Sequence, residues 1–303
     1  MPADDHSLLD TLRGPAASFS FEFFPPKDDE GEAVLWRTIA DLEPLEPTFV
    51  SVTYGAGGTS QERTVRITAR IAEQTTMRPV GHLTLVGQTK GEIESVLKQY
   101  AAAGVDDVLA LRGDPKGGPR ARWEPHPDGM DHAIDLVELA AELGGFQIGV
   151  AAFPEGHPDA ESLDHDAQVL VAKARAGAEY AITQLFFHPD DYLGFVARSR
   201  DAGVTIPILP GIMPITSPAR LRRLLELSGE ELPSELAIAR EVEPTVEGQA
   251  EVGVAADGAA GDVPASKVAA PAKGAAPAKG AAPAKGGAAA KGAAPAKAAA
   301  KKK

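Results

Sequence analysis

Residues 79–113, PVGHLTLVGQTKGEIESVLKQYAAAGVDDVLALRG, contain one complete strand–helix–strand unit. Residues 79–86 and 107–113 are short and apolar on both faces, which is typical of strands buried in a parallel sheet. Residues 91–103 carry apolar side chains at three- and four-residue spacing, as an amphipathic helix does, and Gly104 follows where a helix cap belongs. The stretch therefore predicts two parallel strands joined by a crossover helix.

The same unit repeats along most of the chain. Seven strand-like runs alternate with helical patterns, which predicts a parallel α/β sheet with right-handed crossovers. The other predicted strands are residues 18–25, 49–55, 147–155, 180–187 and 207–214. The other predicted helices are residues 33–42, 60–73, 132–143, 160–176, 191–202 and 218–227.

Polar residues at the ends of the predicted strands favour one of the two architectures that such repeats form. An open doubly wound sheet concentrates its site at one switch point, whereas a (β/α)8 barrel collects side chains from many strand ends. Five strands end in a polar side chain, namely Glu22, Thr53, Asp114, Glu155 and Gln184. This spread favours a TIM barrel.

Charge divides the chain into two unlike parts. The 303 residues carry a net charge of −13, but the first 263 carry −22 and the last forty carry +9 from nine lysines. The acidic part is a poor binder of nucleic acid, because contact with phosphates needs clustered cations. The absence of cysteine excludes disulfides and a thiol nucleophile. Because no long apolar run and no signal-like start are seen, we expect a cytoplasmic protein without a membrane span.

The predicted barrel stops short of an eighth unit. Helical patterning continues through residues 233–243 and 247–256, and Ala-Ala-Pro-Ala-Lys-Gly then repeats three times over residues 269–286. Such a repeat has no large side chain to bury and is expected to be disordered. We therefore predict a barrel domain over residues 1–256 that is incomplete at its eighth βα unit, followed by a disordered tail over residues 257–303.

Seven motifs, one for each predicted strand and in the family's order, together resemble the methylenetetrahydrofolate reductase family. They are Phe21-Glu-Phe-Phe-Pro-Pro-Lys27, Ser51-Val-Thr-Tyr-Gly-Ala-Gly57, Gly81-His-Leu-Thr84, Leu111-Arg-Gly-Asp114, Ala152-Phe-Pro-Glu-Gly-His-Pro158, Ile182-Thr-Gln-Leu-Phe-Phe187 and Pro210-Gly-Ile-Met-Pro214. The resemblance implies a barrel that uses FAD and NADH or NADPH to reduce 5,10-methylenetetrahydrofolate to 5-methyltetrahydrofolate, feeding methionine synthesis. The choice between NADH and NADPH stays open, as does that between a monomer and a homo-oligomer.

Glu22 is the predicted catalytic acid. Because alternate residues of a strand share a face, Glu22 points with Ser20 and Phe24 to the inside, where phenylalanine is expected to desolvate the carboxyl group and favour its protonated form. The resemblance implies that this glutamate protonates a folate nitrogen, so that the methylene bridge opens to an iminium ion. It also implies that Asp114 stabilises the positive charge of that ion.

The resemblance further implies which residues bind substrate and cofactor. Gln184 and Arg220, with Asp114, are the implied folate-binding residues, and the family more often has glutamine at position 220. The implied FAD-binding residues are Thr53, Tyr54, Ala56, His82, Arg112, Gly113, Asp114, His132, Phe153, His157, Ala160, Asp166 and Lys173. Asp166 and Lys173 are seven residues apart and so share one helix face, although either alone is more typical of a solvated surface charge.

Other functions stay open beside the reductase. No pair of histidines has the spacing of metal ligands, so no metal site is predicted. A barrel aldolase would need a strand lysine for a Schiff base, and no predicted strand contains one. Without an eighth strand the barrel would have unpaired edges. The alternative is therefore an inactive or degenerate barrel whose lysine-rich tail binds nucleic acid weakly and without sequence preference.

Overall fold

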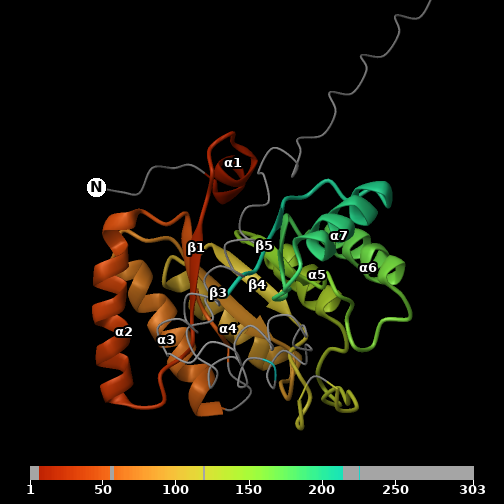
Figure 1. Ribbon diagram of the computed structural model, residues 1–303. Coiled ribbons are helices and arrows are strands. Elements are labelled where there is room, and N and C mark those ends of the chain that lie inside the picture. The colour runs from red at the N-terminus through yellow and green to blue at the C-terminus, as the bar shows by residue number, and fades with distance from the viewer. Residues whose placement is uncertain (1–6, 55–57, 119, 214–224, 226–303) are drawn as a thin grey trace, which may run out of the picture. The chain divides into compact units, whose positions relative to one another are not determined.

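The computed structural model describes residues 7–54, 58–118, 120–213 and 225 (Figure 1). Seven strands form one sheet in which all neighbouring strands are parallel. They are β1 (Ser20–Phe23), β2 (Phe49–Val52), β3 (Pro79–Thr84), β4 (Asp107–Leu111), β5 (Gln147–Ala152), β6 (Tyr180–Thr183) and β7 (Ile208–Leu209). All seven predicted strands are confirmed, and each ends before its apolar run does.

The order of the strands decides the architecture. Neighbours in the sheet are also neighbours in the chain, from β1 through β7, without the reversal that a doubly wound sheet requires. The fold is therefore α/β and TIM-barrel-like, as predicted. Within the described residues, β1 pairs only with β2, and β7 only with β6. Apart from residue 225, four predictions fall outside the described residues. They are the gap at the eighth unit, the helices beyond residue 214, the boundary at residue 256 and the tail.

Six helices alternate with the strands, as predicted, and a seventh precedes them. The helices between strands are α2 (Asp29–Leu42), α3 (Gly58–Gln74), α4 (Lys90–Ala102), α5 (Ala133–Leu143), α6 (Leu163–Ala176) and α7 (Pro189–Asp201), and the turn η1 (Glu43–Leu45) follows α2. A capping box of Thr89 and Glu92 sets the start of α4. Ser162 caps α6, which therefore begins three residues later than predicted. Helix α1 (Leu8–Arg13) was not predicted, because six residues are too few for a periodic signal.

Apolar side chains fill the layer between the sheet and the helices. One cluster there joins Val52 of β2 to Ile67 of α3. On β3, a Cβ added at Gly81 would lie 2.7 Å from the ring of Tyr100, so glycine allows α4 to approach the strand closely. The Tyr100 hydroxyl then donates a hydrogen bond of 2.9 Å to the carbonyl oxygen of His82. This outer layer holds β3 firmly in place.

A second cluster fills the inside of the sheet at the amino ends of the strands. Leu8 of α1 packs there with Phe49 and Tyr180, which are the first residues of β2 and β6. Gly149 of β5 makes room for this cluster, because an added Cβ would collide with the ring of Tyr180. Helix α1 lies beside the start of β1 (Figure 1). The carboxyl ends of the strands, which carry the predicted site residues, form the opposite end of the sheet.

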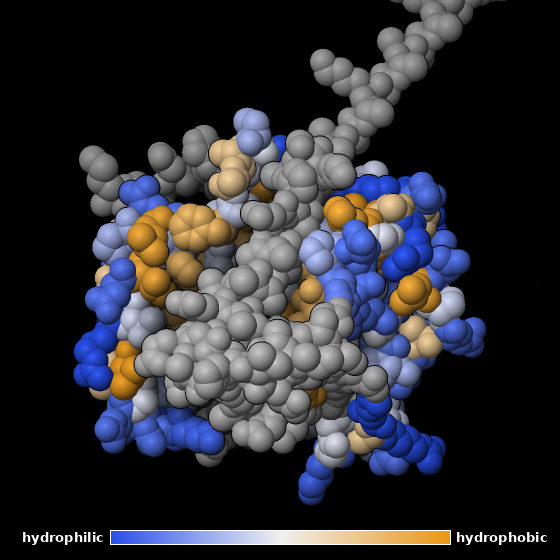
Figure 2. Space-filling model, viewed as in Figure 1, coloured by the Kyte–Doolittle hydropathy of each residue, from blue (hydrophilic) through white to orange (hydrophobic). Residues whose placement is uncertain are grey.

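The visible surface is mostly hydrophilic over the helices, with hydrophobic residues gathered over α2 and β1 (Figure 2). The exposed large apolar side chains include Phe19 (49%), Phe24 (56%) and Val34 (48%). Two of them flank β1, the first strand of the described sheet. None of the described helices combines the length and apolarity needed to cross a membrane.

Candidate active site

Three adjacent strands bring Glu22, Thr53 and His82 together. The Thr53 hydroxyl, just past the end of β2, donates a hydrogen bond of 2.9 Å to Glu22 Oε1. On β3, His82 Nε2 lies 3.7 Å from Glu22 Oε2. The Thr64 hydroxyl holds the end of β2 by donating to the carbonyl oxygen of Thr53 at 2.9 Å. The predicted acid therefore contacts two residues that the resemblance assigns to the cofactor.

His82 is a buried histidine, 2% exposed, and neither ring nitrogen has a hydrogen-bond partner among the described residues. Burial lowers the pKa of His82, and the opposing attraction of the Glu22 carboxylate is the smaller effect. The imidazole is therefore neutral near pH 7, with one nitrogen that can donate and one that can accept.

The prediction that phenylalanine surrounds the Glu22 carboxyl group is wrong. Its side chain is 48% exposed, so phenylalanine does not desolvate the carboxyl group. Phe21 and Phe23 pack in the outer layer against α2 and α3, and Phe24 is itself exposed. Strand alternation places the carboxylate on one face of β1 and two of the phenylalanines on the other, which is why those rings cannot surround it.

Asp114 follows β4 through a turn that favours glycine. Gly113 has a φ of +82°, and a Cβ there would lie 2.8 Å from the side chain of Val86. Asp114 is exposed as a residue. Desolvation of its carboxyl group by the surrounding protein nevertheless raises its pKa, and the Arg112 guanidinium opposes this shift. The turn places this carboxyl group at the same end of the sheet as Glu22.

Arg112 is the centre of a second group of predicted residues. Its Nη1 donates to Asp159 Oδ2 at 2.8 Å, and its Nη2 lies 3.4 Å from His157 Nε2. The guanidinium carbon lies 4.8 Å from the ring centre of Trp123. Phe153 meets His157 edge-on, with 4.7 Å between ring centres. A cation, an imidazole and two aromatic rings are thus gathered after β4 and β5.

Asp166 and Lys173 of α6 are both buried, with exposures of 8% and 9%. The prediction that they share a helix face is confirmed, and the alternative that each is a solvated charge is wrong. Asp166 Oδ2 accepts a hydrogen bond of 3.0 Å from the His157 N–H, which ties α6 to the Arg112 group. Lys173 Nζ donates to the carbonyl oxygen of Ala151 at 2.9 Å. Burial lowers the pKa of Lys173 to about 8, although Asp166 opposes this shift.

Three further predicted residues lie at the same strand ends. Tyr54 is 6% exposed, and burial raises its pKa to about 12. Gln184 follows β6 directly, is half-buried, and its Oε1 accepts a hydrogen bond of 3.1 Å from the Leu185 N–H. The Ala160 N–H donates to the carbonyl oxygen of His157 at 2.8 Å. Ala160 therefore shapes the loop that presents the imidazole to Arg112.

His132 stands at the edge of this arrangement. It is the N-cap residue of α5, its side chain is 69% exposed, and its Nδ1 lies 3.4 Å from Asp131 Oδ1. Asp131 also accepts a hydrogen bond of 2.6 Å from Trp123 Nε1, so Trp123 links His132 to the Arg112 group. Neither Trp123 nor Asp159 was predicted, because a loop residue gives no periodic signal. Ala56 and Arg220 lie outside the described residues.

Comparison with known proteins identifies the family. The family model of methylenetetrahydrofolate reductase matches residues 8–258. The 5,10-methylenetetrahydrofolate reductase of Salmonella typhimurium is 38% identical over 220 residues, which cover 72% of this chain and 72% of that protein. The chain belongs to the methylenetetrahydrofolate reductase family. Methylenetetrahydrofolate reductase (NADH) 1 of Zea mays is 35% identical over 243 residues, which cover 77% of this chain and 41% of that protein.

Methylenetetrahydrofolate reductases are oxidoreductases, and as a member of this family the chain is an enzyme of that class. Among solved structures, an uncharacterized protein from Clostridium thermocellum that binds two copies of 5-methyl-5,6,7,8-tetrahydrofolic acid matches with a TM-score of 0.58. The match covers 82% of this chain and 85% of that one at 15% identity. At this identity it supports the fold alone.

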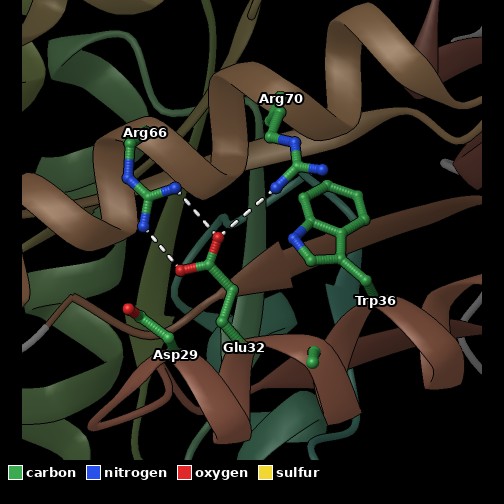
Figure 3. A pocket seen from close by; sticks show the side chains of 6 residues that line it. Asp29, Glu32, Trp36, Arg66 and Arg70 are labelled. Carbon is green, nitrogen blue, oxygen red and sulfur yellow. Dashed lines mark hydrogen bonds and ion pairs between the residues drawn. The ribbon is translucent and has the colours of Figure 1, made fainter.

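A pocket between α2 and α3 lies on the outer layer, apart from the strand ends (Figure 3). Glu32 is the acid at its centre, and two guanidinium groups reach that carboxylate: Arg66 at 2.6 and 2.9 Å, and Arg70 at 3.4 Å. Arg70 also lies over the ring of Trp36, 4.1 Å from its centre. Because Glu32 already engages both cations, this cluster joins two helices. Among the described residues, no group of three histidine, aspartate or glutamate side chains is placed to hold a metal ion.

Proposed function

We propose that this chain reduces 5,10-methylenetetrahydrofolate to 5-methyltetrahydrofolate in the cytoplasm, with FAD as cofactor and NADH or NADPH as reductant, and that the product feeds methionine synthesis. The observation that most supports this is the contact of Glu22 with Thr53 and His82, in a chain of this family. It provides an acid at the carboxyl ends of three adjacent strands, where barrel enzymes carry their catalytic groups.

Glu22 is the proposed general acid. Its proton passes to the folate nitrogen, the electron pair of the breaking C–N bond stays on that nitrogen, and the methylene carbon is left as an iminium ion. The Asp114 carboxylate stabilises the positive charge of this ion. The side-chain amide of Gln184 is proposed to hold the pterin ring through hydrogen bonds. Arg220 is the further proposed folate contact.

The residues around Arg112 fit a dinucleotide cofactor. A diphosphate needs cationic donors, which Arg112 and Lys173 supply. His157 lies in the same group and offers a neutral ring nitrogen, because burial lowers its pKa. Arg112 Nε and both ring nitrogens of His82 are buried without a hydrogen-bond partner among the described residues, so the protein leaves polar atoms unsatisfied here. Bound FAD supplies hydride transfer from the nicotinamide to the folate. The other proposed FAD contacts are Thr53, Tyr54, Ala56, Gly113, Asp114, His132, Phe153, Ala160 and Asp166.

Absorbance spectroscopy on the full chain tests this proposal. With added FAD, the protein should show the yellow band of an oxidised flavin, and anaerobic NADH or NADPH should bleach it. Methylenetetrahydrofolate should then restore the colour while 5-methyltetrahydrofolate forms. Glu22→Gln should slow the restoration by about 10²- to 10⁴-fold, the range for a lost general acid. A bleached wild-type protein that methylenetetrahydrofolate does not recolour would contradict the proposal.

A further inference from the structure

Both carboxylate oxygens of Glu22 face a protein group. Oε1 accepts the hydrogen bond from the Thr53 hydroxyl at 2.9 Å, and Oε2 faces His82 Nε2 at 3.7 Å. Because Thr53 already donates to Oε1, Oε2 is the oxygen left to carry a proton and release it. The two oxygens are therefore not equivalent, because Thr53 binds Oε1 and His82 faces Oε2.

His82 is placed to respond to the charge on Oε2. Glu22 is the charged group that acts on His82 among the described residues, and the ring has no hydrogen bond to any of them. Its strand cannot easily shift, since the Tyr100 hydroxyl holds the carbonyl oxygen of His82. The imidazole is thus fixed beside Oε2, with a gap of 3.7 Å that a small change of the exposed Glu22 side chain can close.

We propose that Thr53 and His82 are positioning residues for Glu22 in the folate step, a role that rests on the proposed function. Thr53 fixes Oε1 throughout. When the proton leaves Oε2 for the folate nitrogen, Oε2 becomes anionic and accepts a hydrogen bond from neutral His82. His82 keeps its own proton, so no charge moves beyond Glu22 and the substrate.

A neutral partner suits an acid that must be protonated again in each turnover. A protonated imidazole would hold the Glu22 carboxylate as an ion pair and oppose the return of its proton. Burial lowers the pKa of His82, so the ring is uncharged at neutral pH. It therefore stabilises the carboxylate as a hydrogen-bond donor without fixing it in the charged form.

Matched variants distinguish the loss of a hydrogen-bond donor from the change in side-chain shape. Thr53→Val and His82→Leu remove a donor, whereas Thr53→Ser and His82→Gln retain one. The readout is the rate of recolouring by methylenetetrahydrofolate per bound flavin, at saturating FAD. Thr53→Val and His82→Leu should each slow it roughly tenfold, since hydrogen bonds to charged groups are the strong ones, and the conservative variants should recover most of the rate.

A double-mutant cycle with Glu22→Gln decides the assignment. If Thr53 and His82 act through Glu22, Thr53→Val and His82→Leu should each change the rate by less than about twofold in the Glu22→Gln background. Equal slowing in both backgrounds would overturn the inference. If Glu22→Gln itself leaves recolouring unchanged, the proposed function fails instead.

A measurement that needs no FAD tests the contact between His82 and Glu22 even if a variant no longer binds the cofactor. In ¹⁵N-histidine-labelled full chain, the His82 ring signals are identified by their loss in His82→Gln. They should shift between the wild type and Glu22→Gln, because the ring faces Oε2. Identical His82 signals in the two proteins would overturn the contact on which the inference depends.

Discussion

Glu32 and Arg66 form a two-point ion pair that joins α2 to α3, with Arg66 Nη1 at 2.9 Å from Oε1 and Nη2 at 2.6 Å from Oε2 (Figure 3). Hydrogen bonding from Arg66 is the main reason that the pKa of Glu32 is lowered. Arg63 and Arg70 approach the same carboxylate at 3.6 and 3.4 Å. Arg63 also lies 3.6 Å from Asp29 Oδ1, so two acids of α2 face three arginines of α3.

Glu32→Gln should lower the free energy of unfolding at pH 7 by about 1–2 kcal/mol. Breaking a fully buried ion pair would cost more, but the arginines around Glu32 are partly solvated. A lowered pKa means that this contribution is present above the unfolded-state pKa of about 4.3 and is lost as the pH falls through the folded-state value. Urea unfolding at pH 7 and pH 3 checks this. Glu30→Gln, on the exposed face of α2, is the control and should change little. A difference between wild type and Glu32→Gln that is equal at both pH values would contradict the prediction.

Gly149→Ala should destabilise the fold by about 1–3 kcal/mol, because the added methyl group collides with the ring of Tyr180 inside the sheet. Gly91→Ala is the matched control, since no atom lies within 4 Å of a Cβ at this position in the first turn of α4. In Gly91→Ala the free energy of unfolding should stay unchanged or rise by up to about 1 kcal/mol. Denaturant midpoints measure both, and a neutral Gly149→Ala would show that the ring of Tyr180 can move aside.

For the proposed cofactor FAD, the affinity should fall as the pH rises through about 8, the pKa of Lys173, because the proposed site then loses a positive charge. Lys173→Met should bind FAD more weakly at pH 7 and lose most of this pH dependence. Without FAD, the free energy of unfolding should rise from about pH 8 to about pH 10.4. In this range Lys173 is protonated in the unfolded chain but neutral in the folded protein. FAD titrations at several pH values test the first point, with Lys98→Met on α4 as control. An unchanged pH dependence in Lys173→Met would assign it to another group.

Arg112→Lys should weaken the proposed FAD binding roughly tenfold although the charge is kept, because lysine cannot span Asp159 and His157 or stack on Trp123. Fluorescence quenching of free FAD on binding measures the affinity. Arg122→Lys, at an exposed position of the following loop, controls for the loss of a guanidinium group. Equal affinities for wild type and Arg112→Lys would mean that only the charge of Arg112 matters.

The seven-strand pattern could be predicted from sequence because buried parallel strands are continuous apolar runs and because glycine follows four of the helices between them. The same logic identified the shared face of Asp166 and Lys173, since spacing along one helix is a local property. It missed α1, which is too short to be periodic and acquires its place through contacts of Leu8 with residues of distant strands.

Sequence patterns alone were enough to place the site residues at the carboxyl ends of the strands and to indicate the family. The surroundings of each site residue became known from the three-dimensional fold. Glu22 was expected among phenylalanines but contacts Thr53 and His82, and Lys173 was compatible with a surface charge but is buried against Ala151. Burial and hydrogen bonding depend on neighbours from other strands, and sheet register and packing set those neighbours rather than local spacing.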